Sequence, residues 1–201
     1  MVPGFRDATS SYAAALEVFA QKLVQVYAVA LGLDRTYFDA AAADPLWRLR
    51  LSHYPATGVG TKGFGIAPHV DTSFFTLLAQ DSVAGLVLAR PDGSWRRVPA
   101  TQGGGNPAAS GGSPPPLLCN TGELLRMWSN DRFRSARHYV LPTVLPTLAT
   151  ADSRSRYSMP FFFNVDAEYV MECLPTCCSA ENPPKYKPMS YLESQGVAQG
   201  E

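Results

Sequence analysis

The feature that most constrains the fold is a change of pattern at Pro45, where a helical stretch gives way to many short runs of β-forming residues. These runs are rich in β-branched and aromatic residues, and turn-forming residues separate them. The expected strands cover Leu46–Tyr54, Thr76–Gln80, Gly85–Arg90, Trp95–Val98, Leu117–Cys119, Arg134–Val140 and Tyr157–Asn164. Many short strands at this spacing are typical of closed or double-sheet β architectures. We therefore expect a mainly β fold, a jelly roll with flanking helices.

The region before Pro45 is expected to be helical. Apolar residues recur at helical spacing between Ser11 and Leu31, namely at Leu16, Phe19, Leu23, Val26 and Ala30. Ser10 or Ser11 can cap the start of this helix, and Gly32 can end it. A shorter helical turn is expected over residues 34–43. The sequence thus predicts a helical segment over 1–45, one β domain over 46–192 and a polar tail over 193–201.

Two connections in the β domain have recognisable turn or loop chemistry. Pro91, Asp92 and Gly93 supply a fixed φ, a side-chain acceptor and a residue that adopts positive φ, which predicts a hairpin. Residues 101–116 are rich in Gly, Pro, Ser and Ala and have no apolar period. We expect them to form a flexible insert between two strands.

Composition limits the class of protein. The chain has 201 residues, of which 46% are hydrophobic, and this is enough for one compact domain with a core. The formal net charge is zero, which argues against nucleic acid, polyanions and membrane surfaces as partners. The N-terminus has no secretory pattern, and no stretch approaches the roughly 20 apolar residues needed to cross a bilayer. We expect a soluble, cytoplasmic, monomeric protein.

The four cysteines are expected to be reduced thiols. They are Cys119, Cys173, Cys177 and Cys178. Adjacent cysteines rarely bridge each other, and no histidine lies near the cluster to complete a zinc site. A disulfide or zinc role is the less favoured alternative.

His69, Asp71 and His138 form the candidate metal site. On an extended strand, His69 and Asp71 point to the same face because they are two residues apart. A third ligand must come from another strand, and His138 shares a face there with Ala136 and Val140. Two imidazoles and one carboxylate are the facial triad of non-haem Fe(II) oxygenases, which leaves metal positions open. The alternative is a hydrogen-bonded His–Asp pair in a β core.

Arg156 and Ser158 form a candidate anion site. Both lie on one face of an expected strand that continues into the apolar run Met159–Phe163. An arginine that points into an apolar interior needs an anion, and a guanidinium with a neighbouring hydroxyl is a sensible carboxylate anchor. The alternative is an exposed strand end with the arginine in solvent.

Four ordered motifs resemble those of the isopenicillin N synthase-like 2-oxoglutarate/Fe(II)-dependent dioxygenases. The segment 68–81, with His69 and Asp71, is similar to the first ligand motif of that family. Residues 120–135 with His138 are similar to the block that carries the second histidine, and Arg156–Phe163 to the co-substrate motif. Residues 173–175 and 183–186 are similar to the family's tail. The resemblance extends over residues 46–192 and implies a double-stranded β-helix core.

The resemblance also implies cofactors and residue roles. His69, Asp71 and His138 would hold Fe(II), while Arg156 and Ser158 would bind the distal carboxylate of 2-oxoglutarate. The other co-reactants would be O₂ and a small organic substrate, with ascorbate as a reductant. Tyr54 matches a family tyrosine near the co-substrate, whereas Ser52 stands where many relatives have asparagine, and His53 matches a variable position. The implied reaction hydroxylates, desaturates or otherwise oxidises the substrate and releases succinate and CO₂.

Departures from the family pattern keep two alternatives open. The chain begins almost at the long helix, ahead of which relatives carry a substantial region, and residues 141–153 must loop out to keep Arg156 in place. One alternative is an iron oxidase of the same family that needs no 2-oxoglutarate, with Arg156 and Ser158 holding the substrate's own carboxylate. The other is a truncated β domain that binds metal or a partner without turnover.

Overall fold

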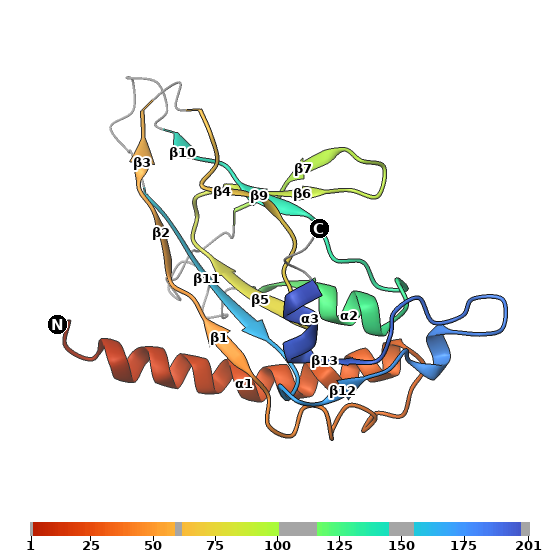
Figure 1. The fold of residues 1–201 in the computed structure, drawn as a ribbon. Helices are drawn as coiled ribbons and strands as arrows, with labels where there is room; N and C mark the ends of the chain where they lie inside the picture. The colour runs from red at the N-terminus through yellow and green to blue at the C-terminus, as the bar shows by residue number, and fades with distance from the viewer. Residues whose placement is uncertain (1, 59–61, 101–115, 145–154, 198–201) are drawn as a thin grey trace.

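The computed structural model describes residues 2–58, 62–100, 116–144 and 155–197 (Figure 1). Apart from residue 116, the predicted insert over 101–116 lies outside the described residues. The same holds for 145–153 of the predicted loop and for 198–201 of the tail.

Two antiparallel sheets face each other and make up the β domain (Figure 1). The larger sheet has the order β1–β11–β5–β8, with β2 also paired to β11, and the smaller has the order β4–β9–β6–β7. The larger sheet consists of β1 Trp47–Leu49, β2 Ser52–Tyr54, β5 Phe75–Gln80, β8 Leu118–Thr121 and β11 Arg156–Phe163. The smaller consists of β4 Ile66–His69, β6 Leu86–Ala89, β7 Trp95–Arg97 and β9 His138–Val140. Apart from the β6–β7 pair, neighbouring strands in these sheets are distant in sequence, and the predicted jelly roll is confirmed.

The remaining elements lie around these two sheets. Two-residue strands form a parallel pair, β3 Ala56–Thr57 with β10 Thr143–Val144, and an antiparallel pair, β12 Val170–Met171 with β13 Met189–Ser190. The helices are α1 Phe5–Ala30, α2 Glu123–Trp128, α3 Tyr191–Val197 and a 3₁₀ turn, η1 Pro175–Cys177. The predicted hairpin joins β6 to β7, with Gly93 at φ 82° and Asp92 accepting a hydrogen bond from the backbone of Ser94.

Helix α1 ends where the sequence predicts but begins earlier. Its N-cap is Gly4, so the prediction of a Ser10 or Ser11 cap is wrong. Asp7 lies in the first turn, where a negative charge is favourable near the free N–H groups. Gly32, at φ 77°, follows the helix as expected for a C-terminal glycine. The predicted helical turn over 34–43 is a series of turns without a regular helix.

Helix α1 packs on the outer face of the larger sheet through small residues (Figure 1). Its buried positions are Ala13, Leu16, Ala20, Val24 and Ala28. The predicted apolar stripe is therefore wrong in part, since Phe19 and Val26 are 46% and 60% exposed. Alanine side chains are small and let the helix axis approach the sheet closely, so the alanine-rich face of α1 is the one that packs on the sheet. By length and composition α1 could also span a membrane, contrary to the sequence expectation, but helices of a globular core pass the same test.

Strand β11 separates the core from the interior of the barrel. Its odd-numbered residues Phe161 and Phe163 belong to the core that α1 covers. Its even-numbered residues, Arg156, Ser158, Pro160 and Phe162, line a cavity between the two sheets. The alternation follows from the two-residue period of a strand. The same period sets the faces of β2 and β5, which pair with β11 on either side.

Candidate metal centre

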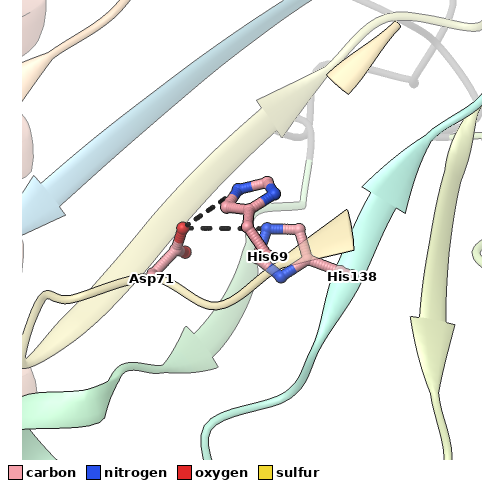
Figure 2. Close-up of side chains that lie close together, drawn as sticks. All are labelled: His69, Asp71 and His138. Atoms are coloured by element: carbon pink, nitrogen blue, oxygen red, sulfur yellow. Dashed lines mark ion pairs between the residues drawn. The ribbon is translucent and has the colours of Figure 1, made fainter. Parts of the chain in front are cut away.

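The structure brings His69, Asp71 and His138 together from two distant segments of the chain (Figure 2). His69 ends β4 and pairs directly with His138 of β9 across the smaller sheet. Asp71 lies in the turn after β4, so the expectation that it shares a strand with His69 is wrong. Its Oδ1 atom nevertheless lies 3.8 Å from Nε2 of His69 and 3.7 Å from Nε2 of His138. One potential ligand atom from each residue lies within 4.8 Å of the other two.

Both imidazoles are oriented by the backbone two residues earlier in the chain. Nδ1 of His69 lies 2.8 Å from the carbonyl oxygen of Ala67, and Nδ1 of His138 lies 2.9 Å from that of Ala136. A carbonyl only accepts hydrogen bonds, so each Nδ1 carries the proton and donates it. In this tautomer of the neutral ring, Nε2 carries the lone pair, and both Nε2 atoms face Oδ1 of Asp71. This is the arrangement of metal-binding histidines.

Asp71 is held by the oxygen that does not face the histidines. Its Oδ2 accepts hydrogen bonds from Oγ1 of Thr76 at 2.7 Å and from Nδ2 of Asn120 at 2.8 Å. The residue is buried, at 6% exposure. Oδ1 therefore has one direction left, toward the two imidazoles.

The N-terminus of α2 fixes the turn that carries Asp71. The backbone N–H of Glu123 donates to the carbonyl of Asp71 at 2.8 Å, and that of Leu124 to the carbonyl of Ser73. The first N–H groups of a helix lack partners inside it, and here this turn satisfies them. At Gly122, a Cβ would lie 1.9 Å from the carbonyl oxygen of Ser73, so only glycine fits.

Arg156 and Ser158 lie on the wall of the same cavity as the triad. Across the strands, Arg156 pairs with Tyr54 and Ser158 with Ser52, so these four side chains form one patch. The Arg156 guanidinium lies 5.0 Å from the centroid of the Tyr54 ring. The predicted set is thus assembled on the interior face, and the exposed strand end is ruled out because Arg156 is only 1% exposed.

The hydrogen-bonding capacity of Arg156 is only partly used. Its Nη2 donates to Oε1 of Gln80 at 3.0 Å, while its buried Nε and Nη1 have no partner in the described chain. The Ser52 hydroxyl is buried and unpartnered there as well. Buried charged groups without partners are costly, so this wall is suited to an anion with several acceptor oxygens. The donor set fits a carboxylate.

Three residues of the centre were missed by sequence reasoning. Thr76 and Asn120 position Asp71, and Gly122 allows the close approach of α2. All three lie inside motifs that carry the family resemblance, but their roles depend on pairing between β5 and β8. His53 is not among the residues that line the cavity with the triad, and its ring stacks on Tyr157 with ring centroids 4.7 Å apart.

A known protein family matches the part of the chain that contains these residues. Residues 47–165 match the family model of the 2OG-Fe(II) oxygenase superfamily. The chain belongs to this superfamily. The matched segment contains the triad, Tyr54, Arg156 and Ser158, as the resemblance implied.

Several superfamily members are similar over nearly the whole chain. A 2-oxoglutarate-Fe(II) type oxidoreductase of Emericella nidulans is 32% identical over 97% of this chain, and azadirone synthase of Melia azedarach is 30% identical over 94%. The chain covers 54% and 53% of those two proteins, about half of their length. The crystal structure of a full-length Neurospora crassa protein in complex with alpha-KG and thymine superimposes with a TM-score of 0.82 at 26% identity, over 99% of this chain and 58% of that one.

Proposed function

We propose that this chain is the catalytic core of a non-haem Fe(II)- and 2-oxoglutarate-dependent dioxygenase that oxidises a small organic molecule and releases succinate and CO₂. In this proposal His69, Asp71 and His138 hold the iron. Arg156 and Ser158 bind the distal carboxylate of 2-oxoglutarate, and Tyr54 lies against it. Ascorbate serves as the reductant that keeps the iron ferrous.

The observation that carries the proposal is the partly unpartnered Arg156 beside the triad. A metal triad alone is compatible with several chemistries, including the oxidase alternative. A buried guanidinium with two unpartnered nitrogens in the same cavity calls for an anionic co-substrate close to the metal. The complex of the Neurospora crassa protein with alpha-KG supports this choice of anion.

Each residue has a defined task in the proposed reaction. His69, Asp71 and His138 would hold Fe(II), which would supply the redox chemistry of the reaction with O₂. In the neutral imidazoles, the backbone carbonyls of Ala67 and Ala136 keep the proton on Nδ1, so that Nε2 is the atom available to the metal. Thr76 and Asn120 keep the carboxylate of Asp71 in place, and Arg156 orients the co-substrate.

An anaerobic titration tests the iron and co-substrate sites together. Adding Fe(II) and then 2-oxoglutarate to the chain should give a weak visible metal-to-ligand band. Arg156→Gln should raise the 2-oxoglutarate concentration needed for half of the band, while the exposed Arg96→Gln should not. Absence of the band in the unaltered chain contradicts the proposal.

Succinate release separates the dioxygenase from the oxidase alternative. Under air, succinate should form in a one-to-one ratio with oxidised substrate. Substrate oxidation without succinate would favour the oxidase, in which Arg156 binds the substrate itself. Metal binding without any turnover would favour the metal-binding β domain.

We further propose that the protein acts as a cytoplasmic monomer on small molecules, with no membrane or nucleic acid as partner. The balanced charge of the chain and the packing of one face of α1 in the core support this. Size-exclusion chromatography with light scattering tests the monomer, and fractionation of cells tests the location.

A further inference from the structure

The inner face of the larger sheet carries two more arginines beside the triad. The register of β1 on β11 sets Arg48 opposite Phe162. Arg50 follows two residues later and donates its backbone N–H to the carbonyl of Pro160 at 2.9 Å. Residues two apart in extended chain share a face, so Arg48 and Arg50 continue the interior face that Pro160 and Phe162 line.

Neither arginine has an anionic partner in the part of the chain that the structure describes. The ion pairs of arginine found there are made by Arg126, with Glu123 and Asp131. Instead, the Arg48 guanidinium lies 5.0 Å from the centroid of the Phe162 ring. The side chains of Arg48 and Arg50 are both exposed, so each guanidinium is hydrated and can be reached by a ligand from solvent.

Arg48 and Arg50 line a second cavity that opens directly at the triad. Its volume is about 390 Å³, within the range of ligand pockets, and His69, Asp71, Phe162 and Tyr191 also line it. Among the described lining residues, Asp71 is the only carboxylate. Its Oδ2 is already bonded to Thr76 and Asn120. The mouth of the site therefore has an excess of positive charge, before any metal is counted.

The ring of Tyr191, from α3, adds a neutral polar group to this cavity. Burial raises the pKa of its phenol, and the nearby positive charge of Arg48 opposes part of that rise. Because the pKa stays above its usual value near 10, the hydroxyl is protonated at neutral pH. It can donate to an oxygen of a bound molecule but cannot neutralise the arginines.

We propose that this cavity is the substrate site and that Arg48 and Arg50 select a small organic acid. The carboxylate of the substrate pairs with the two guanidinium groups, and its hydrocarbon or aromatic body lies against Phe162, next to the metal ligands. The inference rests on the proposed function and adds the substrate class to it. In this arrangement Arg156 binds the carboxylate of the co-substrate at one end of the interior face, and Arg48 and Arg50 bind the carboxylate of the substrate at the other end.

The test compares carboxylic acids with their primary amides, which match in shape and differ in charge. The probes are acid–amide pairs with phenyl, cyclohexyl and linear alkyl bodies, for example 4-phenylbutanoate and 4-phenylbutanamide. Binding to the full chain is measured by calorimetry without air, both metal-free and loaded with Fe(II) and 2-oxoglutarate. We expect at least one acid to bind at least about tenfold more tightly than its amide in the loaded chain.

Three variants show where the preference arises. The double variant Arg48→Gln, Arg50→Gln should remove the preference for the acid, and Arg48→Lys, Arg50→Lys should keep part of it. The matched control Arg96→Gln, Arg97→Gln, on the exposed strand β7, should keep all of it. In each variant the visible band with Fe(II) and 2-oxoglutarate reports independently on the folded co-substrate site.

The outcomes separate this inference from the proposed function. If the band forms but every acid binds no better than its amide, the substrate class is wrong and the dioxygenase proposal stands. If the preference persists in the glutamine double variant, the acid is bound elsewhere, for instance at Arg156, and the inference is overturned. If the band is absent while the metal-free chain still prefers acids through Arg48 and Arg50, the site binds organic acids but the dioxygenase proposal fails.

Discussion

The triad lies in one cavity with the Arg156 wall, the patch formed by Arg156, Ser158, Tyr54 and Ser52. The two regions differ in how many of their side-chain donors and acceptors have hydrogen-bond partners. In the triad, every polar side-chain atom that does not face the ligand position has a partner: both Nδ1 atoms have a backbone carbonyl, and Oδ2 of Asp71 has Thr76 and Asn120. Arg156, in contrast, is 1% exposed and leaves Nε and Nη1 without partners in the described structure.

This difference shows which side chains of the site are fixed by hydrogen bonds within the chain and which still have unpaired donors. The triad side chains are held in position by the fold, so the metal meets a preorganised set of ligands. Arg156 keeps two nitrogens without partners in the described chain, and leaving buried charged donors unpaired is costly. In the proposed complex, the carboxylate of the co-substrate would accept hydrogen bonds from them.

Removing the triad carboxylate should have the largest effect. We expect Asp71→Ala to weaken Fe(II) binding by more than about 100-fold, since loss of a ligand exceeds the effect of losing its supporting hydrogen bonds. Anaerobic competition with a chelating dye measures the affinity. Asp92→Ala, in the β6–β7 turn, is the matched control and should bind iron normally. Unchanged binding in Asp71→Ala would exclude this carboxylate as a ligand.

Replacing the unpartnered arginine should separate ligand binding from stability. We expect Arg156→Met to weaken 2-oxoglutarate binding by about 100-fold, because a bidentate charged contact is lost. Fe(II) affinity should stay unchanged. The free energy of unfolding of the ligand-free chain should rise by about 1 kcal/mol, since an apolar side chain removes an incompletely bonded buried charge. Urea denaturation measures it, and a clear loss of stability would show that the guanidinium is satisfied in the free protein.

Removing one hydrogen bond to Asp71 should have an intermediate effect. We expect Asn120→Ala to lower Fe(II) affinity by about 10-fold, because the carboxylate loses one of its two anchors. Cys119→Ala is the control from the same strand, since its thiol faces outward to Tyr27. Equal affinities in the two variants would mean that Thr76 alone positions Asp71.

Replacing the histidine outside the cavity should have the smallest effect. We expect His53→Gln to leave Fe(II) and 2-oxoglutarate affinity unchanged, and to change the free energy of unfolding by less than about 0.5 kcal/mol. Its ring only stacks on Tyr157 at the outer surface of the sheet. The same chelator competition and denaturation assays measure both quantities. A fall in iron affinity would show that residue parity along β2 misassigns the inner face.

Local sequence patterns predicted one long helix and most strands of the two main sheets, but not all of their boundaries, and they did not predict β4 or the two-residue strands β3, β10, β12 and β13. The expected strand 46–54 is two strands, β1 and β2, and the expected strand 134–140 is reduced to His138–Val140. Helices α2 and α3 were not predicted. They have only 6 and 7 residues, which is too short for a periodic pattern of apolar residues to be recognised. The apolar stripe of α1 was misplaced because close packing on the sheet favours alanine over larger residues.

For the site, the sequence by itself determined which chemical groups are present and which of them share a face. The alternation of side chains along β11 is local, so Arg156 and Ser158 could be assigned to one face without any knowledge of neighbours. The ordered motifs then indicated which histidines belong with Asp71.

Only the tertiary structure decided how those faces combine. Strand register depends on contacts between residues far apart in the chain, so it is not readable from local alternation. It sets His69 opposite His138, brings Asn120 to Asp71, places Arg48 opposite Phe162 and leaves two nitrogens of Arg156 unpartnered within the described chain. The candidate ligands were thus readable from sequence, whereas their orientation, and the positive charge at the mouth of the second cavity, depend on long-range pairing.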